Sequence, residues 1–162
     1  MSNKIPMRAY YRKIRRDYYK NIISKMSEKE CEKFYCDYFE RIREIIEPKQ
    51  EIKTIAGFMP IKNEPDCLFL LKKFLNLGYE LFLPFIEQKH SAMIFRQYTG
   101  DNTNFIKDIY GIPCPDENAK AIAKPDVVLV PLLAFDSRLF RLGYGGGFYD
   151  KFLGGLKKKE QM

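Results

Sequence analysis

The chain contains 162 residues, of which 46% are hydrophobic and 30% charged, a balance typical of a compact globular domain and not of a disordered segment. The longest apolar run, residues 127–135, contains Pro131 and is far shorter than the roughly 20 residues of a membrane-spanning helix. The N-terminal segment is charged and lacks a hydrophobic stretch, so we expect no secretory signal and a cytoplasmic protein.

The cysteine and histidine content argues against a zinc site. Cys31, Cys36, Cys67 and Cys114 form no C-x-x-C pair, and His90 is the only histidine. We therefore expect four free thiols, as is usual in a reducing compartment. His90 lies in a polar loop, where we expect an exposed side chain without a function.

The net charge of +7 is concentrated at the N-terminus. Residues 1–25 carry Asp17 as their only acidic side chain, whereas the rest of the chain is balanced. Such a segment is typical of a contact with nucleotide phosphate, nucleic acid or an acidic membrane, and also of a plain solvated helix face. Its basic residues are Lys4, Arg8, Arg12, Lys13, Arg15, Arg16, Lys20 and Lys25.

The first expected element is a basic helix over residues 7–25. Ile14, Tyr18 and Ile22 recur every four residues, which predicts one buried stripe on this helix. Its tyrosines could stack on bases, but we expect them to pack against the protein. They are Tyr10, Tyr11, Tyr18 and Tyr19.

The next elements follow a helix, strand, helix, strand order. Ser27 and Glu30 form a capping box for a second helix that ends before Pro48. Residues 54–58 read as a short strand. A helix over residues 67–77 follows, with Asp66 as its cap and Gly78 at its end. Because another strand is expected at residues 79–83, this βαβ unit predicts parallel pairing.

The remaining elements complete an α/β fold. Residues 92–98 read as a strand and residues 100–124 as loops. Residues 126–130 form a continuous apolar run, which is typical of a strand covered on both faces. We therefore expect a single domain over residues 1–162, with three layers, a mostly parallel sheet covered by helices, and an N-terminal basic helical segment.

The segment after that buried strand carries the strongest functional signal. Gly143, Gly145, Gly146 and Gly147 lie between an expected strand and an expected helix, an arrangement that can cradle a phosphate with backbone N–H groups. Arg141 could neutralise the phosphate, and Asp150 could hold Mg²⁺. A glycine-rich loop taken alone is equally typical of a tight structural turn.

Taken as a whole, the segment resembles the signature of the 5-formyltetrahydrofolate cyclo-ligases (5,10-methenyltetrahydrofolate synthetases). It has Pro131, an Ala-Phe-Asp that ends at Asp136, and the run Arg-Leu-Gly-Tyr-Gly-Gly-Gly-Phe-Tyr-Asp that ends at Asp150. Other stretches resemble family motifs as well: Lys4-Ile-Pro-Met-Arg8, Phe58 to Glu64, Met93 with Phe95, and Gly111-Ile112.

The resemblance implies an ATP- and Mg²⁺-dependent ligase of folate and one-carbon metabolism. In this family the γ-phosphoryl group of ATP is transferred to the formyl oxygen of 5-formyltetrahydrofolate. A second folate nitrogen then closes the ring, giving 5,10-methenyltetrahydrofolate, ADP and phosphate. Phosphoryl transfer depends on positioning and charge neutralisation more than on a nucleophilic side chain, which suits a chain with one histidine.

The resemblance also implies roles for individual residues. Arg141 and Tyr149 would be catalytic, and Asp150 would bind Mg²⁺. Met59 and Glu64 would bind the folate, with Glu64 accepting hydrogen bonds from the pterin. ATP would be bound by Lys4, Arg8, Arg141, Leu142, Gly143, Tyr144, Gly145, Gly146, Gly147, Phe148 and Tyr149.

Two of these assignments have alternatives. Arg12 and Arg16 have the same spacing as Lys4 and Arg8 and could replace them on the ATP phosphates. Asp136 could support the metal, but we expect it to be a turn residue.

The chain departs from the family pattern in three places. Leu139 stands where glycine is common, and Cys114 stands where glutamate is common. The chain ends at Met162, whereas family members continue into a further strand and a second acidic residue for the metal. We therefore expect an open sheet edge that allows self-association, and the alternative function is an impaired member that only binds nucleotide or folate.

A different class of function, a binder of polyanions, would use the basic helix alone. It has no need of the glycine signature, so we expect small-molecule substrates and neither nucleic acid nor membrane as a partner.

Overall fold

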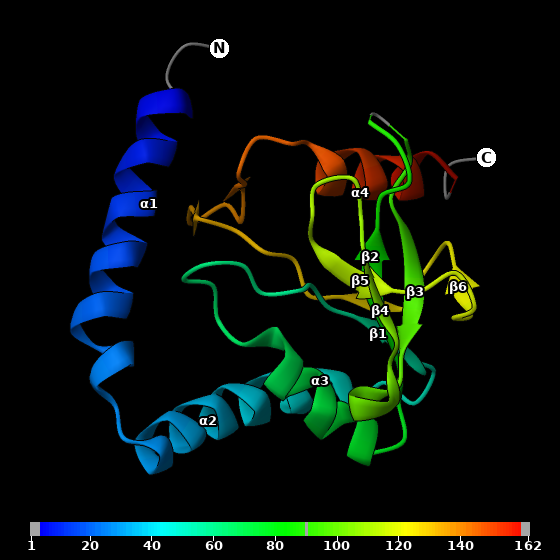
Figure 1. The fold of residues 1–162 in the computed structure, drawn as a ribbon, viewed down its shortest axis with the longest axis horizontal. Coiled ribbons are helices and arrows are strands. Elements are labelled where there is room, and N and C mark those ends of the chain that lie inside the picture. Colours follow the sequence, from blue (N-terminus) through cyan, green and yellow to red (C-terminus); the bar gives the residue numbers. More distant parts are fainter. Residues whose placement is uncertain (1–3, 90, 160–162) are drawn as a thin grey trace.

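A five-stranded sheet forms the centre of the computed structural model, which describes residues 4–89 and 91–159 (Figure 1). The strand order is β6-β3-β2-β1-β7. The expectation for His90 lies outside the described residues. The sheet strands are β1 (Thr54–Ala56), β2 (Glu80–Phe85), β3 (Ile94–Tyr98), β6 (Ala121–Ile122) and β7 (Val127–Val128). The helices are α1 (Lys4–Asn21), α2 (Glu28–Ile46), α3 (Cys67–Asn76) and α4 (Phe148–Lys159), with 3-10 turns η1 (Ile23–Lys25) and η2 (Gly100–Asn102).

The two faces of the sheet carry separate cores, which gives the three expected layers. Leu81 and Leu83 of β2 pack with α2 and α3 on one face. Phe82, between them in the sequence, packs on the other face, where Phe152 of α4 also lies. This alternation follows from the two-residue period of a strand. The predicted α/β class is confirmed.

The sheet is mixed, with its parallel part at one side. β1 pairs in parallel with β2 and with β7, which confirms the βαβ prediction. β2–β3 and β3–β6 are antiparallel. Only residues 86–93 join β2 to β3, too few for the crossover of about a dozen residues that parallel pairing requires. The expectation of a mostly parallel sheet therefore holds for β7, β1 and β2 alone.

The predicted caps of α2 and α3 are present. Ser27 and Glu30 form the capping box of α2. The Asp66 side chain accepts a hydrogen bond from the Phe69 N–H at the start of α3, and Gly78 after its end has φ +87°. These local signals were readable because each depends on residues only a few positions apart.

The predicted buried stripe of α1 is wrong. Ile14, Tyr18 and Ile22 are 44%, 49% and 44% exposed, and no residue along Lys4–Asn21 of α1 is fully buried. Most of the tyrosines expected to pack are also exposed. The helix stands to one side of the layers (Figure 1), and its contacts with them come from a different face, which carries arginines.

The segment expected to be loops contains short strands. β4 (Phe105–Lys107) and β5 (Pro113–Pro115) form a two-stranded ribbon, and β6 joins the main sheet. Cys114 is fully buried in β5, and its thiol donates to the carbonyl oxygen of Ile106 at 3.7 Å. Burial raises the pKa of Cys114, so this position accommodates a small neutral group.

The remaining general expectations concern thiols and membranes. All four cysteines are free, as predicted. Within residues 4–89 and 91–159, no helix combines the length and the apolar character needed to cross a membrane. Self-association through a sheet edge stays a prediction.

A second ribbon, β8 (Ala134–Phe135) with β9 (Arg141–Leu142), precedes α4. Asp136 shapes its turn, because one carboxylate oxygen accepts from the N–H groups of Arg138 and Phe140. This confirms the turn role expected of Asp136. Leu139 in the same turn has φ +64° and is 81% exposed.

The left-handed backbone of Leu139 gives a first prediction. A non-glycine residue in this region costs about 1–2 kcal/mol, partly offset in a glycine variant by greater freedom of its unfolded chain. We expect Leu139→Gly to stabilise the protein by about 0.5–1 kcal/mol in urea unfolding. Leu139→Ala is the control, since it removes the exposed side chain and keeps Cβ. Equal stability of the two variants would contradict the prediction.

Asp126 fixes the start of β7 against the start of β1. One carboxylate oxygen accepts from the N–H groups of Lys53 and Thr54, each at 2.9 Å, and from the Thr54 hydroxyl at 2.8 Å. These hydrogen bonds lower the pKa of Asp126, with the Lys53 N–H as the main cause. The stability they provide is present above the unfolded pKa of about 3.9 and is lost as the pH falls through the lower folded value.

We therefore expect Asp126→Asn to lower the free energy of unfolding by about 1 kcal/mol at neutral pH. The difference from wild type should shrink as the pH falls below about 4. Asp101→Asn, which removes an exposed ion pair with Lys72, should change stability little. A difference that persists unchanged in acid would show that the Asp126 charge is not involved.

Candidate functional site

Two loops leave the sheet at the same edge and extend toward α1 (Figure 1). One is residues 57–66, which follows β1, and the other is residues 129–147, which follows β7. β1 and β7 are parallel, so their carboxyl ends meet at this edge. Such an edge is the usual place for a ligand site in α/β proteins.

The glycine-rich loop, residues 143–147, connects β9 to α4. The strand before the loop thus belongs to the small β8–β9 ribbon. The sequence had instead suggested a strand of the main sheet. Gly145 and Gly147 have φ +112° and +71°, which other residues adopt only with strain. Gly147 accepts the N–H of Lys151 in the first turn of α4. The loop therefore leads directly to a helix N-terminus, which favours anions.

Arginines of α1 bind the backbone of this loop. Arg8 Nε donates to the Gly143 carbonyl at 3.0 Å, and Arg12 Nη2 donates to the Tyr144 carbonyl at 3.1 Å. A Cβ added to Gly145 would lie 3.4 Å from Arg8 Cζ. The side of the loop that faces α1 is therefore lined by the positive charges of Arg8 and Arg12.

Only one member of each predicted basic pair contacts the loop among the described residues. Arg8 does so from the pair with Lys4, and Arg12 from the pair with Arg16. Arg16 turns toward Asp17, and in the described part of the chain no hydrogen bond or ion pair joins Lys4 or Arg16 to the loop. Sequence reasoning missed Arg15, which lies on the same face as Arg8 and Arg12 because the spacing of four and then three residues follows the helical repeat.

Arg141 and Asp150 flank the loop and are paired with each other. Arg141 Nη2 lies 2.5 Å from Asp150 Oδ1, and the Asp150 side chain is 75% exposed. Arg141 Cζ also lies 5.7 Å from the centre of the Tyr149 ring. The structure therefore brings together three residues that the sequence assigned to catalysis and metal binding.

Asp150 suits a magnesium ion only together with a ligand. Among the described residues, no three His, Cys, Asp or Glu side chains gather as a metal site. Mg²⁺ is commonly held by one or two carboxylates plus substrate phosphates and water. The donor set thus fits Mg²⁺ that arrives with a nucleotide, and does not fit a cage made of protein alone.

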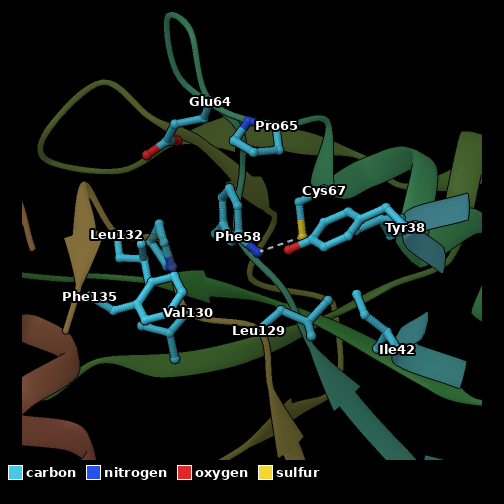
Figure 2. A pocket seen from close by; sticks show the side chains of 12 residues that line it. Tyr38, Ile42, Phe58, Glu64, Pro65, Cys67, Leu129, Val130, Leu132 and Phe135 are labelled. Atoms are coloured by element: carbon cyan, nitrogen blue, oxygen red, sulfur yellow. Dashed lines mark hydrogen bonds between the residues drawn. The ribbon is translucent and has the colours of Figure 1, made fainter. Parts of the chain in front are cut away.

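A cavity of about 240 Å³ lies beside the loop that follows β1. Its walls are mostly apolar, and Glu64 is its one carboxylate (Figure 2). Figure 2 shows Glu64 and Pro65 at one end, with Phe58 between them and Leu129 in this view. The other lining residues include Tyr38, Ile42, Cys67, Leu129, Val130, Leu132 and Phe135.

Glu64 is 7% exposed, unusually low for a carboxylate. Its Oε2 accepts the Ile61 N–H at 2.9 Å, and its Oε1 lies 3.7 Å from Arg15 Nη1. Burial raises the pKa of Glu64, and the Ile61 N–H and Arg15 oppose that shift. A charge held in this way is a strong acceptor for a ligand that offers N–H donors.

Tyr149 follows the glycine-rich loop at the start of α4 and is influenced electrostatically by Glu64 and Cys67, which line the cavity. Burial is the main cause of its raised pKa, and Cys67 and Glu64 add to the shift while Arg141 opposes it. Tyr149 therefore keeps its proton at neutral pH and can donate a hydrogen bond. Met59 belongs to the loop that follows β1 and packs against the core. It is not among the residues that line the cavity.

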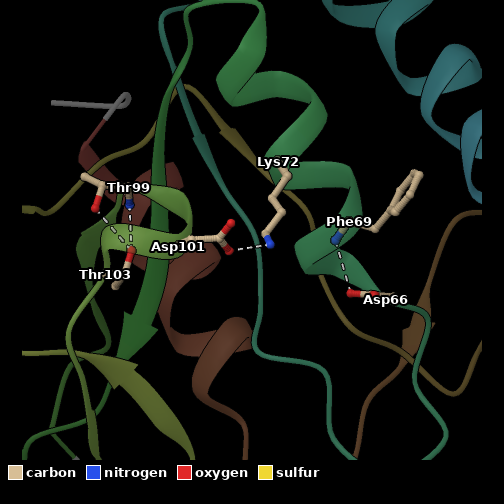
Figure 3. A network of polar contacts seen from close by, with 6 residues as sticks. All are labelled: Asp66, Phe69, Lys72, Thr99, Asp101 and Thr103. Carbon is tan, nitrogen blue, oxygen red and sulfur yellow. Dashed lines mark hydrogen bonds and ion pairs between the residues drawn. The ribbon is translucent and has the colours of Figure 1, made fainter.

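A second hollow, of about 460 Å³, lies between the first half of α3 and η2. Its polar side chains already have partners within the protein (Figure 3). Lys72 pairs with Asp101, Asp66 caps α3, and Thr103 accepts the N–H of Thr99. This network stabilises local structure, and none of the described residues that line this hollow is a buried carboxylate like Glu64.

The family model for 5-formyltetrahydrofolate cyclo-ligases matches residues 9–162. A 5-formyltetrahydrofolate cyclo-ligase of Mycolicibacterium smegmatis is 32% identical over 106 residues, which cover 62% of this chain and 55% of the relative. A probable 5-formyltetrahydrofolate cyclo-ligase of Caenorhabditis elegans is 27% identical over 146 residues, or 85% of this chain and 69% of the relative. The chain thus spans little more than half of the mycobacterial relative.

Solved structures show the same fold. The 5,10-methenyltetrahydrofolate synthetase of Aquifex aeolicus superposes with a TM-score of 0.68 and 27% identity, covering 91% of this chain and 72% of that one. The 5,10-methenyltetrahydrofolate synthetase of Mycoplasma pneumoniae gives a TM-score of 0.62 at 23% identity, covering 94% and 77%. These superpositions support the α/β arrangement that positions the two loops.

Proposed function

Because the chain belongs to the 5-formyltetrahydrofolate cyclo-ligase family, we propose that it converts 5-formyltetrahydrofolate and ATP to 5,10-methenyltetrahydrofolate, ADP and phosphate. One observation carries the proposal beyond family membership. A glycine-rich loop bordered by arginines and an apolar cavity with one buried carboxylate meet at a single edge of the sheet. The reaction requires a phosphate site and a pterin site in this relation.

The nucleotide phosphates would lie on residues 143–147 and the N-terminus of α4. Backbone N–H groups there can donate to phosphate oxygens. Arg8 and Arg12 are within reach because they already bind loop carbonyls, and Lys4 lies one helical turn before Arg8. Arg141 would exchange its contact with Asp150 for a phosphate oxygen.

Asp150, released from Arg141, would hold Mg²⁺ together with the phosphates. When bound, the ion neutralises phosphate charge during the transfer. Asp150 is suited to this role by its exposure and by its place in the first turn of α4.

The folate would occupy the cavity with its pterin ring at Glu64. A flat ring matches the apolar walls, and a carboxylate can accept two parallel N–H bonds from the pterin. Met59, behind the loop, would support the shape of this site. The formyl group would then face Tyr149 and the glycine-rich loop.

In the reaction, the formyl oxygen attacks the γ-phosphorus and ADP leaves. The second folate nitrogen attacks the activated formyl carbon, phosphate departs with the formyl oxygen, and that nitrogen loses its proton. The protein aligns the two reactants and neutralises charge with Arg8, Arg12 and Arg141. Tyr149 can donate a hydrogen bond to a developing oxyanion.

We further infer a cytoplasmic enzyme with small-molecule substrates. The four free thiols favour a reducing compartment. Arg8 and Arg12 of α1 are engaged with the glycine-rich loop, which supports a nucleotide and not a nucleic acid as their anion.

The direct test follows the near-ultraviolet absorbance of the methenyl product. Product should form only with ATP, Mg²⁺ and 5-formyltetrahydrofolate together. Binding of both ligands without turnover would support the binding-only alternative. Absence of binding would contradict the proposal.

The phosphate loop gives a prediction at Gly145. In Gly145→Val, the new side chain meets a positive φ and the Arg8 guanidinium, so ATP affinity measured by calorimetry should fall at least tenfold, a loss of about 1.4 kcal/mol or more. Gly154→Val is the matched control, because a Cβ there has no neighbour within 4 Å. Unchanged ATP affinity in a folded Gly145→Val protein would exclude this loop as the phosphate site.

The folate site gives a prediction at Glu64. Glu64→Gln removes the charge with little change of shape, so affinity for 5-formyltetrahydrofolate should fall about ten- to a hundredfold while ATP affinity changes little. Glu51→Gln, at an exposed position, is the control. A loss of ATP affinity with folate affinity intact would mean that the two sites are assigned the wrong way round.

A further inference from the structure

Arg15 is a largely buried cation at the junction of the two ligand sites. Its side chain is 19% exposed. Within the described residues, its Nε and Nη1 atoms are inaccessible to solvent and have no hydrogen-bond partner. Burial lowers the pKa of Arg15, yet an arginine stays charged in proteins. A buried charge with unpaired donors is costly, so its location calls for a reason.

The surroundings of Arg15 suggest that reason. The guanidinium lies 3.7 Å from Glu64 Oε1 and 5.0 Å from the centre of the Tyr144 ring. The ring fixes the guanidinium from the side of the glycine-rich loop through a cation–π contact. The Tyr144 hydroxyl is also buried, and no described residue forms a hydrogen bond with it. Arg15 thus connects the proposed nucleotide loop to the proposed folate carboxylate.

Glu64 needs such a neighbour in order to act as an acceptor. A carboxyl group in an apolar cavity tends to bind a proton, and a protonated Glu64 could accept fewer N–H bonds. The Ile61 N–H satisfies Oε2 alone. Arg15 is the cation that faces Oε1.

We propose that Arg15 is a positioning residue of the folate site, which holds Glu64 ionised and turned toward the pterin N–H groups while the Tyr144 ring holds Arg15 in place. This inference rests on the proposed function, because it takes Glu64 as the folate contact. It assigns Arg15 a role through Glu64 and not a direct part in phosphoryl transfer.

Among the described residues, the titratable groups that interact electrostatically with Glu64 come from three elements: Arg15 of α1, Cys67 of α3 and Tyr149 of α4. Burial raises the pKa of Cys67 to about 12 and also raises that of Tyr149. Both stay neutral near pH 7, and Arg15 stays charged. A pH dependence of folate binding in this range therefore reports on Glu64.

The experiment measures the affinity for 5-formyltetrahydrofolate without ATP between about pH 5.5 and 8.5. In wild type, affinity should fall as acidification protonates Glu64. In Arg15→Met the pKa of Glu64 rises further, so the loss should begin about one pH unit higher or more, a tenfold weaker affinity on the acidic side. Arg15→Lys keeps the charge and should retain most of the wild-type profile.

Two comparisons separate this role from a structural one. Arg16→Met on the same helix, whose side chain faces Asp17, should leave the profile unchanged. In a Glu64→Gln background, Arg15→Met should cause no further change in the profile, because the group through which it acts is gone. Arg15→Gln is measured in parallel, and urea unfolding establishes that each variant is folded.

The outcomes distinguish the two claims. If wild type binds no 5-formyltetrahydrofolate, or if Glu64→Gln binds it as wild type does, the proposed folate site fails and the role of Arg15 fails with it. If Glu64→Gln loses affinity while Arg15→Met and Arg15→Gln keep the wild-type profile, the role of Arg15 alone is overturned.

Discussion

The position of α1 depends on arginine contacts with the glycine-rich loop. No residue along Lys4–Asn21 of α1 is fully buried, and the side chain that comes nearest to burial is a cation, Arg15, so apolar packing is not the main attachment of this helix. The hydrogen bonds from Arg8 and Arg12 to loop carbonyls, and the stacking of Arg12 and Arg15 on Tyr144, join segments 129 to 135 positions apart. These contacts are at once the attachment of the helix and one wall of the site.

This arrangement concentrates positive charge where the proposed reaction develops negative charge. The sheet contributes a rigid edge from which both loops start, and α4 contributes its N-terminus. The cavity beside Glu64 is apolar and partly closed, which strengthens electrostatic contacts in it. A fold with these parts needs no nucleophilic side chain for phosphoryl transfer, which agrees with a sequence that has a single histidine.

The local signals in the sequence were reliable, whereas the signals that depend on tertiary contacts were not. The capping box of α2, the Asp66 cap of α3 and the parallel β1–α3–β2 unit were all predictable, because each depends on short-range geometry. The apolar stripe on α1 misled, because periodicity shows which residues share a face and not which face is covered. The alternative prediction, that the face with Arg8, Arg12 and Arg15 contacts the rest of the protein, would have fitted the same helical spacing. The proposed roles of Glu64 and Tyr149 came from the resemblance alone, whereas those of Arg141 and Asp150 were also suggested by their places beside the glycine-rich loop. Sequence spacing could not show that Glu64 lies near the other three residues.

In the proposed function, the nucleotide site and the folate site meet closely enough for direct phosphoryl transfer from ATP to the formyl oxygen. The most direct measurement uses 5-formyltetrahydrofolate labelled with oxygen-18 in the formyl group and analyses the released phosphate by mass spectrometry. Direct transfer predicts that the phosphate carries the heavy oxygen, because the formyl oxygen leaves bonded to phosphorus. Unlabelled phosphate formed together with the methenyl product would contradict direct transfer and would separate the two sites in the mechanism.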